Sequence, residues 1–110
     1  MPPLKRSYLA WMLLISQLFA PSVSLAWDGA VTGVPFEIDV TDGGNFGFRV
    51  YLPSAMCGNG YNWAYLNATD SNYSTYVAAL LMAKAQGGTV MVYSNKDSNG
   101  YCHIGYVSLL

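Results

Sequence analysis

Apolar and polar residues alternate through the first half of the chain, which is the pattern of strands that bury one face. A first strand is predicted over residues 34–41 and a second over 46–52, and the glycine-rich segment 42–45 between them suits a tight turn. These two strands are expected to pair as a hairpin. The residues expected on the buried face of the first strand are Val34, Phe36, Ile38 and Val40.

The period then changes to that of a helix. Apolar residues recur at three- and four-residue spacing from Tyr73 to Gln86, which predicts one helix of about four turns. Asp70 or Ser71 is expected to cap its start, and the Gly87-Gly88 pair to end it.

Three further strands are predicted over residues 62–66, 89–94 and 101–109. The protein is therefore expected to be mainly β with one helix, in the order β-β-β-α-β-β. This is the order of the OB-fold, a small five-stranded Greek-key barrel. An open antiparallel sheet with the helix packed across one face uses the same elements and is the alternative.

Residues 1–26 have the layout of a secretory signal peptide. Lys5 and Arg6 precede an apolar run over residues 8–20, and small residues lead up to a cleavage site after Ala26. The apolar run is shorter than the ~20 residues that span a bilayer, which disfavours a membrane anchor. The sequence thus predicts a secreted or periplasmic protein in which residues 27–110 form one domain, with no membrane span after cleavage.

The chain has two cysteines, Cys57 and Cys102. Two buried free thiols are the alternative, but in an oxidising compartment a disulfide is the favoured state. The bridge is expected to tie the loop after the second strand to the last strand. It would also remove both cysteines from the candidates for catalysis.

The charge balance of residues 27–110 argues against polyanionic partners. Three cations, Arg49, Lys84 and Lys96, stand against six carboxylates, giving a formal net charge of −3. Nucleic-acid binding and attraction to anionic membranes both need clustered Lys and Arg. No nucleic-acid partner is expected.

No catalytic constellation is found in the sequence. His103 is the only histidine and is interpreted as a structural or strand-surface residue, because no G-x-S-x-G motif accompanies it. Glu37 and Asp39 share the solvated face of a strand, whereas a glycosidase pair faces across a cleft. No metal site, cofactor or enzymatic activity is predicted.

Aromatic and amide side chains are the unusual component. Residues 27–110 hold eight tyrosines, two tryptophans and seven asparagines, a chemistry suited to sugars or to protein interfaces. Tyr61, Tyr65, Tyr73 and Tyr101 are the candidate ligand-binding tyrosines. Trp63, beside the disulfide loop, is interpreted as core packing.

Several short motifs together resemble the B subunits of AB5 toxins of the subtilase-cytotoxin and pertussis-like group. They are Trp27, Thr32-Gly33-Val34, Met56-Cys57, Trp63, the helix over 73–86 and the segment 87–93. The resemblance implies an OB-fold subunit that assembles into a ring of five with a toxin A subunit and binds glycans on its outer surface. It also implies that Thr32 stands where the family has a serine that contacts sialylated sugar. The family's extra C-terminal segment with a second cysteine pair is missing here.

The sequence therefore predicts an exported, non-enzymatic binding module, with a glycan or a protein receptor as its partner. The alternative is an exported structural or inhibitory domain that binds another protein and has no affinity for sugar.

Overall fold

The structure, a computed structural model, describes residues 26–110, so the predicted signal segment lies outside the described residues except for Ala26. The described chain folds into six strands and one helix, which confirms the predicted mainly-β class with a single helix. The elements are β1 (Gly29–Gly33), β2 (Glu37–Val40), β3 (Phe48–Tyr51), β4 (Trp63–Leu66), α2 (Tyr73–Gln86), β5 (Val90–Lys96) and β6 (Cys102–Leu109). No helix in this part of the chain is long and apolar enough to cross a membrane.

All six strands belong to one sheet with the order β1-β5-β6-β4-β3-β2. Neighbouring strands are antiparallel except β4 and β6, which run parallel. Within residues 26–110 the sheet is open and not a closed barrel, because β1 and β2 form its two edges. Of the two predicted architectures, the open sheet with one packed helix is the one observed, with one parallel pair added.

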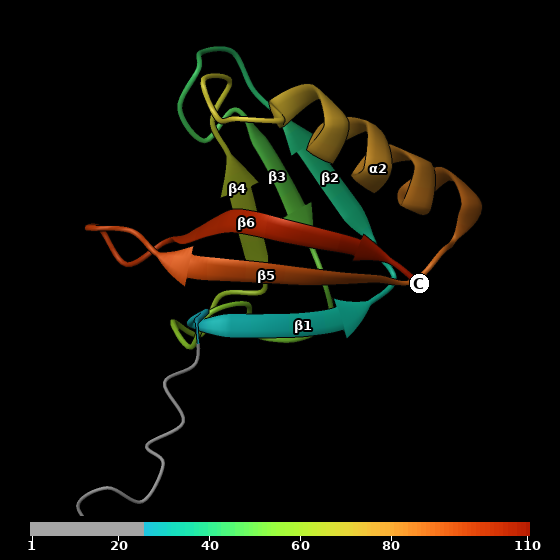
Figure 1. The fold of residues 1–110 in the computed structure, drawn as a ribbon, viewed down its shortest axis with the longest axis horizontal. Helices are drawn as coiled ribbons and strands as arrows, with labels where there is room; N and C mark the ends of the chain where they lie inside the picture. The colour runs from blue at the N-terminus through green and yellow to red at the C-terminus, as the bar shows by residue number, and fades with distance from the viewer. Residues whose placement is uncertain (1–25) are drawn as a thin grey trace, which may run out of the picture.

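The two edges of the sheet are nevertheless close in the chain, because only residues 34–36 separate β1 from β2. A segment of this length spans little more than about 10 Å, so the sheet must curl until its edges approach each other. Figure 1 shows the result: β1, β5 and β6 cross the direction of β2, β3 and β4. If β1 and β2 are counted as two halves of one bent strand, the sheet has five strands, which is the number that the sequence predicts.

Strand β1 was not expected from the sequence. Its five residues hold glycine at both ends and bury one side chain, Val31, so they carry almost no alternating signal. The predicted first strand starts too early, since Pro35 has no N–H for a ladder and the chain turns there from one edge to the other. Regular pairing begins again at Glu37.

The predicted buried face of this strand is wrong for three of its four residues. Val34, Phe36 and Val40 are 40%, 51% and 71% exposed, and only Ile38 packs against the core. The reason is position. Val40 lies on β2, an edge strand with a neighbouring strand on one side only, whereas Val34 and Phe36 lie in the connection between β1 and β2.

The core lies between the inner face of the sheet and helix α2. The helix buries Leu80 and Ala83, and the Tyr76 hydroxyl donates a hydrogen bond of 2.9 Å to the carbonyl of Gly105 on β6. The strand residues of the core alternate along the chain, as expected for one buried face. They are Val31, Phe48, Val50, Ala64, Leu66, Val90, Val92 and Ile104.

The helix has the predicted bounds but a different start. Asn72 is the N-cap residue, in a left-handed conformation with φ of 62° and no capping bond from its side chain, so the prediction of Asp70 or Ser71 is wrong. The Asp70 carboxylate instead accepts a hydrogen bond of 2.7 Å from the Asn67 backbone. At the other end Gly87 takes the left-handed C-cap conformation, as its position predicts.

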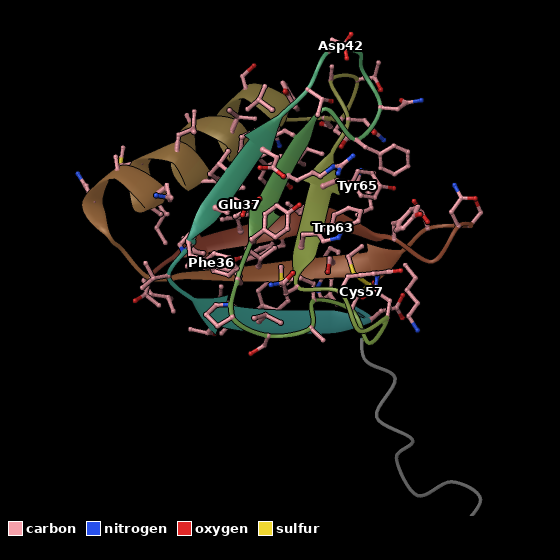
Figure 2. The ribbon with its side chains drawn as sticks, turned by 180° about the vertical axis from the view of Figure 1, so that it is seen from behind. Phe36, Glu37, Asp42, Cys57, Trp63 and Tyr65 are labelled. Carbon is pink, nitrogen blue, oxygen red and sulfur yellow. A yellow bond between two sulfur atoms is a disulfide. The ribbon has the colours of Figure 1, made fainter. Side chains whose placement is uncertain are left out.

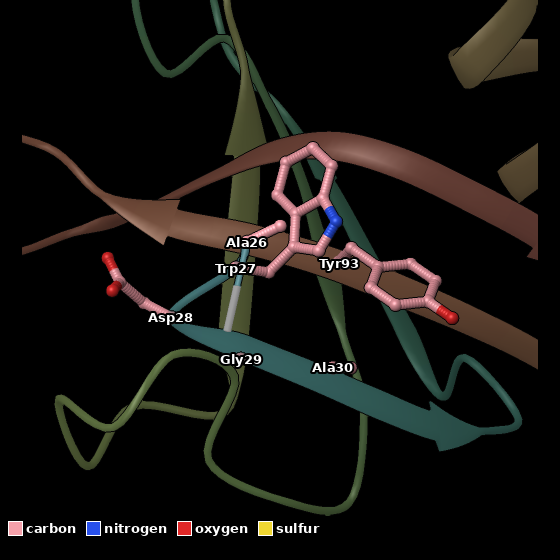
Figure 3. A pocket seen from close by; sticks show the side chains of 6 residues that line it. All are labelled: Ala26, Trp27, Asp28, Gly29, Ala30 and Tyr93. Carbon is pink, nitrogen blue, oxygen red and sulfur yellow. The ribbon is translucent and has the colours of Figure 1, made fainter. Parts of the chain in front are cut away.

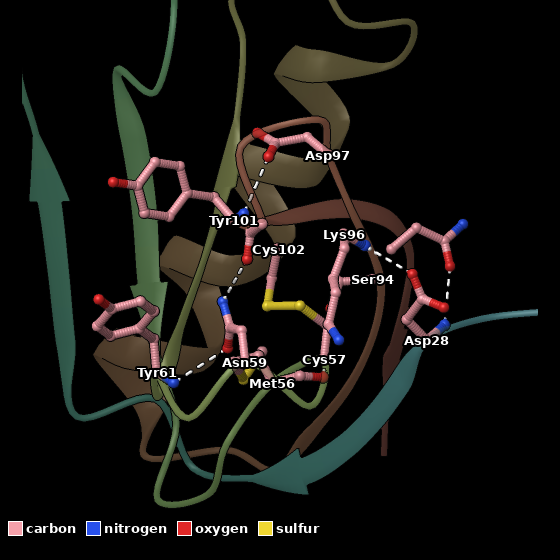
Figure 4. The surroundings of a disulfide bond; sticks show 12 residues. Asp28, Met56, Cys57, Asn59, Tyr61, Ser94, Lys96, Asp97, Tyr101 and Cys102 are labelled. Atoms are coloured by element: carbon pink, nitrogen blue, oxygen red, sulfur yellow. Dashed lines mark hydrogen bonds between the residues drawn. A yellow bond between two sulfur atoms is a disulfide. The ribbon is translucent and has the colours of Figure 1, made fainter.

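The predicted disulfide is present. Cys57, in the loop between β3 and β4, is bonded to Cys102 at the start of β6, with 5.7 Å between the Cα atoms. Figure 4 shows the bond joining these two segments beneath the β5–β6 turn. Both cysteines are buried.

Candidate binding face

The face of the sheet opposite helix α2, here called the outer face, carries most of the candidate chemistry. Strand register aligns its side chains in two rows across the strands. Glu37, Tyr51 and Trp63 form the first row, on β2, β3 and β4. The second row, on β2, β3, β4 and β6, is Asp39, Arg49, Tyr65 and His103. In Figure 2 the labelled members Glu37, Trp63 and Tyr65 lie on the side of the sheet away from the helix.

Five rings at one end of this face form an aromatic cluster, made up of Phe46, Tyr61, Trp63, Tyr65 and Tyr101. Trp63 lies 5.3 Å from Tyr101 and 6.1 Å from Tyr61 between ring centroids, and Tyr61 lies 6.3 Å from Tyr101. The three planes are tilted by 33–45° to one another, so these rings present their faces in similar directions. Tyr61 is 52% exposed, and Trp63 and Tyr101 are half-buried. The exposed parts of these rings together form an apolar surface at this end of the outer face.

Tyr65 is the buried base of the aromatic cluster. Only 3% of it is exposed, because Phe46 covers its ring at 4.4 Å and His103 stacks on it at 4.8 Å. Its hydroxyl donates a hydrogen bond of 2.6 Å to the Asp97 carboxylate. Burial, together with this bond, raises the pKa of Tyr65, so the phenol is neutral. The Tyr65 ring is therefore much less accessible to a ligand than the Tyr61 ring.

Asp97 organises the turn between β5 and β6 that carries Tyr101. Its carboxylate accepts hydrogen bonds from the backbone N–H groups of Asn99 and Tyr101, at 2.8 and 2.9 Å. Partial burial favours a higher pKa for Asp97, but the bonds from the Tyr65 hydroxyl and from the turn outweigh it and lower the pKa. The ionised carboxylate thus fixes Tyr101 against Trp63.

We expect the substitution Asp97→Asn to destabilise the fold by about 1–2 kcal/mol, since hydrogen bonds to a charged acceptor are weakened. Because the folded-state pKa is lowered, the wild-type stability is fully present above the unfolded value near ~4 and falls as pH drops through the folded value. Urea unfolding at pH 7 and pH 3 should show a smaller pH dependence in the variant. An equal pH dependence in both proteins would contradict this role.

Two hydrogen bonds from the Asn59 side chain, here called the Asn59 clamp, hold Tyr61 beside Tyr101. The Asn59 amide nitrogen donates to the Gly100 carbonyl at 2.9 Å, and its oxygen accepts from the Tyr61 backbone at 3.0 Å. Figure 4 shows these bonds next to the disulfide, which joins the same two segments through Cys57. Together these links bring the loop before β4 and the β5–β6 turn together, so that Tyr61 lies next to Tyr101.

Arg49 is the cation of the outer face. Its guanidinium lies 5.0 Å from the centroid of the Trp63 ring, and its Nε donates to the Phe46 carbonyl at 3.3 Å. A guanidinium stacked in this way stabilises the ring through its quadrupole and limits the ring's freedom. Arg49 therefore serves to orient Trp63.

His103 lies at the far end of the second row. Its Nε2 is 2.7 Å from a carboxylate oxygen of Asp70, and its ring is parallel to that of Tyr65, with 2° between the planes. This carboxylate also receives the Asn67 backbone bond, so His103 links β6 to the segment before the helix. Among residues 26–110, no group of three or more His, Cys, Asp and Glu side chains is placed to hold a metal ion.

The remaining predicted site residues lie elsewhere. Thr32 is exposed on the edge strand β1, which β5 and β6 separate from β4, and Tyr73 is half-buried where helix α2 packs on the core. A small open pocket of about 140 Å³ lies between the Trp27 and Tyr93 rings, as Figure 3 shows. Ala30 also lines it and, by strand alternation, is on the same face of β1 as Thr32. Of the five candidates, only Tyr61, Tyr65 and Tyr101 come together.

Three contributors to the outer face were missed from the sequence: Trp63, Phe46 and Arg49. The signal for Trp63 was present, because alternation places residues 61, 63 and 65 on one face of β4. Phe46 is predicted as the first residue of the second strand, but it lies in the loop before β3 with a positive φ of 57° and joins the cluster from there.

No protein-family model, curated protein or solved structure matches this chain.

Proposed function

We propose that this protein is an exported, non-enzymatic binding module whose outer face binds carbohydrate. The observation that carries the proposal is the group of Tyr61, Trp63 and Tyr101, with ring centroids within 6.3 Å of one another and planes tilted by 33–45°. Tyr61 is exposed, and the other two rings are half-buried. The apolar face of a sugar ring packs well on such rings. Carboxylate and amide groups beside them can accept or donate hydrogen bonds to its hydroxyls.

The position of the cluster supports this function. In OB-folds, the face of the second and third strands and the loops beside it bind oligonucleotides and oligosaccharides. The corresponding elements here are β3 and β4, the loop before β3 with Phe46, and the β5–β6 turn with Tyr101. Because the sheet is open and not a closed barrel, this support comes from the order of the elements and not from a shared barrel.

Charge favours carbohydrate over nucleic acid as the ligand. Proteins that stack single-stranded bases on aromatic residues also neutralise the backbone with clustered cations. The outer face contributes one arginine, Arg49, beside the carboxylates Glu37 and Asp39. A phosphate backbone would be repelled there, whereas an uncharged sugar would not.

Export and toxin assembly remain parts of the proposal. The disulfide between Cys57 and Cys102 suits an oxidising compartment and so supports export. A ring of five, a toxin A subunit and a sugar contact at Thr32 follow only from the resemblance to AB5 B subunits. Affinity at one face would be modest, so such a ring would gain through multivalency.

We expect Trp63→Ala to weaken glycan binding about tenfold or more, because it removes the ring that contacts both Tyr61 and Tyr101. Tyr61→Ala should also weaken binding while leaving the core intact, since Tyr61 is 52% exposed. A glycan array followed by calorimetric titration of the ligands it identifies provides the measurement.

Tyr106→Ala is the matched control, because Tyr106 is equally exposed but packs against Tyr93 on β5, away from the cluster. It should bind as the wild type does. If a folded protein binds no glycan at high concentration, or if both cluster variants bind normally, the proposal is wrong. The protein-interaction alternative would then take its place.

A further inference from the structure

We propose that the outer face selects glycans that carry protonated amino groups, with Glu37 and Asp39 holding the ammonium beside the aromatic cluster. This inference rests on the proposed carbohydrate function and names its ligand class. It follows from the register of the strands, from the partners of the charged side chains and from the net charge of the domain.

The register places the carboxylates and the rings within reach of one oligosaccharide. Glu37, Tyr51 and Trp63 are direct cross-strand neighbours on β2, β3 and β4. Adjacent strands lie about 4.8 Å apart, so Glu37 and Trp63 are separated by roughly 10 Å across the sheet. A glycan that packs one ring beside Trp63, whose ring also carries the Arg49 guanidinium, and continues across Tyr51 would bring its next units over Glu37 and Asp39.

The surface along this path is suited to a sugar. The Tyr51 hydroxyl donates to the Asp39 carboxylate at 2.9 Å, which directs that carboxylate toward the middle of the face. Phe36, 51% exposed, lies 6.1 Å from the Tyr51 ring and extends the apolar surface past β3. Rings and carboxylates therefore continue from the aromatic cluster to the edge strand.

Glu37 and Asp39 form a pair of acids that lacks a cationic partner within residues 26–110. Within the described residues, the acidic and basic side chains that come within salt-bridge distance of each other are Asp70 and His103. Arg49 is opposite Asp39 in the register, but its guanidinium is placed over Trp63 instead. A hydrogen bond with Asp39 is the largest cause that raises the pKa of Glu37, and the Asp39 charge adds to it, so the two carboxyl groups lie close together.

An ammonium group would supply the charge that this pair lacks. An anionic sugar would meet two carboxylates in a domain that already carries a net charge of −3 over residues 27–110. A neutral sugar would bind through the rings alone. Among glycans of one backbone, the amine-bearing member should therefore bind best.

The test compares two ligands that share a backbone and differ in charge. A tetramer of glucosamine and a tetramer of N-acetylglucosamine are titrated into the purified protein by calorimetry, at low and at high salt. We expect the glucosamine tetramer to bind about fivefold more tightly at low salt, with the preference falling as salt screens the carboxylates.

Two isosteric variants assign the preference to the pair. Glu37→Gln and Asp39→Asn should each reduce glucosamine affinity by about twofold to fivefold and leave the acetylated ligand unchanged. Asp42→Asn is the control, because it removes the same charge from an exposed loop position outside the two rows. It should leave both affinities unchanged.

The outcomes separate this inference from the proposed function. If neither tetramer nor any other glycan binds, the carbohydrate function itself fails. If glycans bind but acetylated or sialylated ones bind as well as the amine, or if Asp42→Asn has the same effect as the pair variants, only the amine selectivity is overturned. Binding of a lysine-rich peptide in place of all sugars would also overturn it.

Discussion

Replacing both cysteines, Cys57→Ser with Cys102→Ser, is expected to lower the free energy of unfolding by about 4 kcal/mol. The bridge closes a loop with a sequence separation of 45, and the chain-entropy model gives this value for a loop of that length. For a domain of this size such a loss lowers the melting temperature by roughly 15–30 °C. The free energy of unfolding of a small domain is low, so a loss of this size is a large fraction of it.

Thermal unfolding followed by circular dichroism measures the loss. If the double variant does not fold, wild-type protein can be folded first and then reduced, and its unfolding followed in urea with and without reductant. Where the variant does fold, its unfolding midpoint should equal that of the wild type in reductant. A loss below about 1 kcal/mol would mean that strand pairing alone already holds the two segments together and that the disulfide adds little stability.

The bridge also bears on binding. Cys57 precedes the loop that carries Asn59 and Tyr61, and Cys102 follows Tyr101 directly. Without the bond, the Asn59 clamp alone would hold these two segments together. The reduced protein should therefore bind glycan more weakly, even at temperatures where its sheet is intact.

The elements with strong periodic signals were predictable from the sequence. The helix from Tyr73 to Gln86 has the predicted bounds, and β3, β4, β5 and β6 lie within two residues of their predicted ends. The disulfide followed from compartment and cysteine count alone. In each case a local pattern and the tertiary environment favour the same conformation.

The edges of the sheet were not predictable in the same way. Val34, Phe36 and Val40 alternate as a buried strand would, yet they are exposed, because the first two lie in the connection between β1 and β2 and Val40 lies on an edge strand. No local pattern shows either position. Strand β1 was missed for a different reason: with glycine at both ends, its sequence has almost no alternation of apolar and polar residues. Its pairing with β5 joins segments about 60 residues apart, which no local rule reports.

In the candidate site too, residue types were predictable from the sequence, whereas the positions of the side chains depend on tertiary contacts. Tyr61 and Tyr101 were identified from residue type, and they meet only because the Asn59 clamp and the disulfide join their segments. Trp63 was assigned to the core because tryptophan is usually buried. Its actual place on the outer face depends on strand register, which a one-residue shift would reverse.

The glycine that starts β1 is expected to be as sensitive as the cysteines. A Cβ added at Gly29 would lie 1.9 Å from the Met56 carbonyl oxygen and 2.7 Å from the Cα of Cys57. Both contacts are with backbone atoms, which cannot relieve the clash by changing rotamer as a side chain could. We therefore expect Gly29→Ala to destabilise the fold by about 3 kcal/mol or more, at the upper end of overpacking effects.

Urea unfolding measures this effect, and Gly44→Ala provides the control. An added Cβ at Gly44 would meet its nearest neighbour, the Cβ of Ala68, at an ordinary 3.9 Å, so a change within about 0.5 kcal/mol is expected. If Gly29→Ala were as mild as this control, β1 would not be held as tightly against the loop as its contacts indicate.

The two large effects should also depend on each other. The segment that Gly29 touches, Met56 and Cys57, is held in place by the disulfide and by the Ser94 hydroxyl, 3.4 Å from the Met56 carbonyl. Without the disulfide the loop can move away from the new methyl group. Gly29→Ala should therefore cost less in the Cys57→Ser/Cys102→Ser background than in the wild type, and a double-mutant cycle measures this coupling. Strictly additive losses would show that the loop is held against β1 by the remaining contacts and not by the bridge.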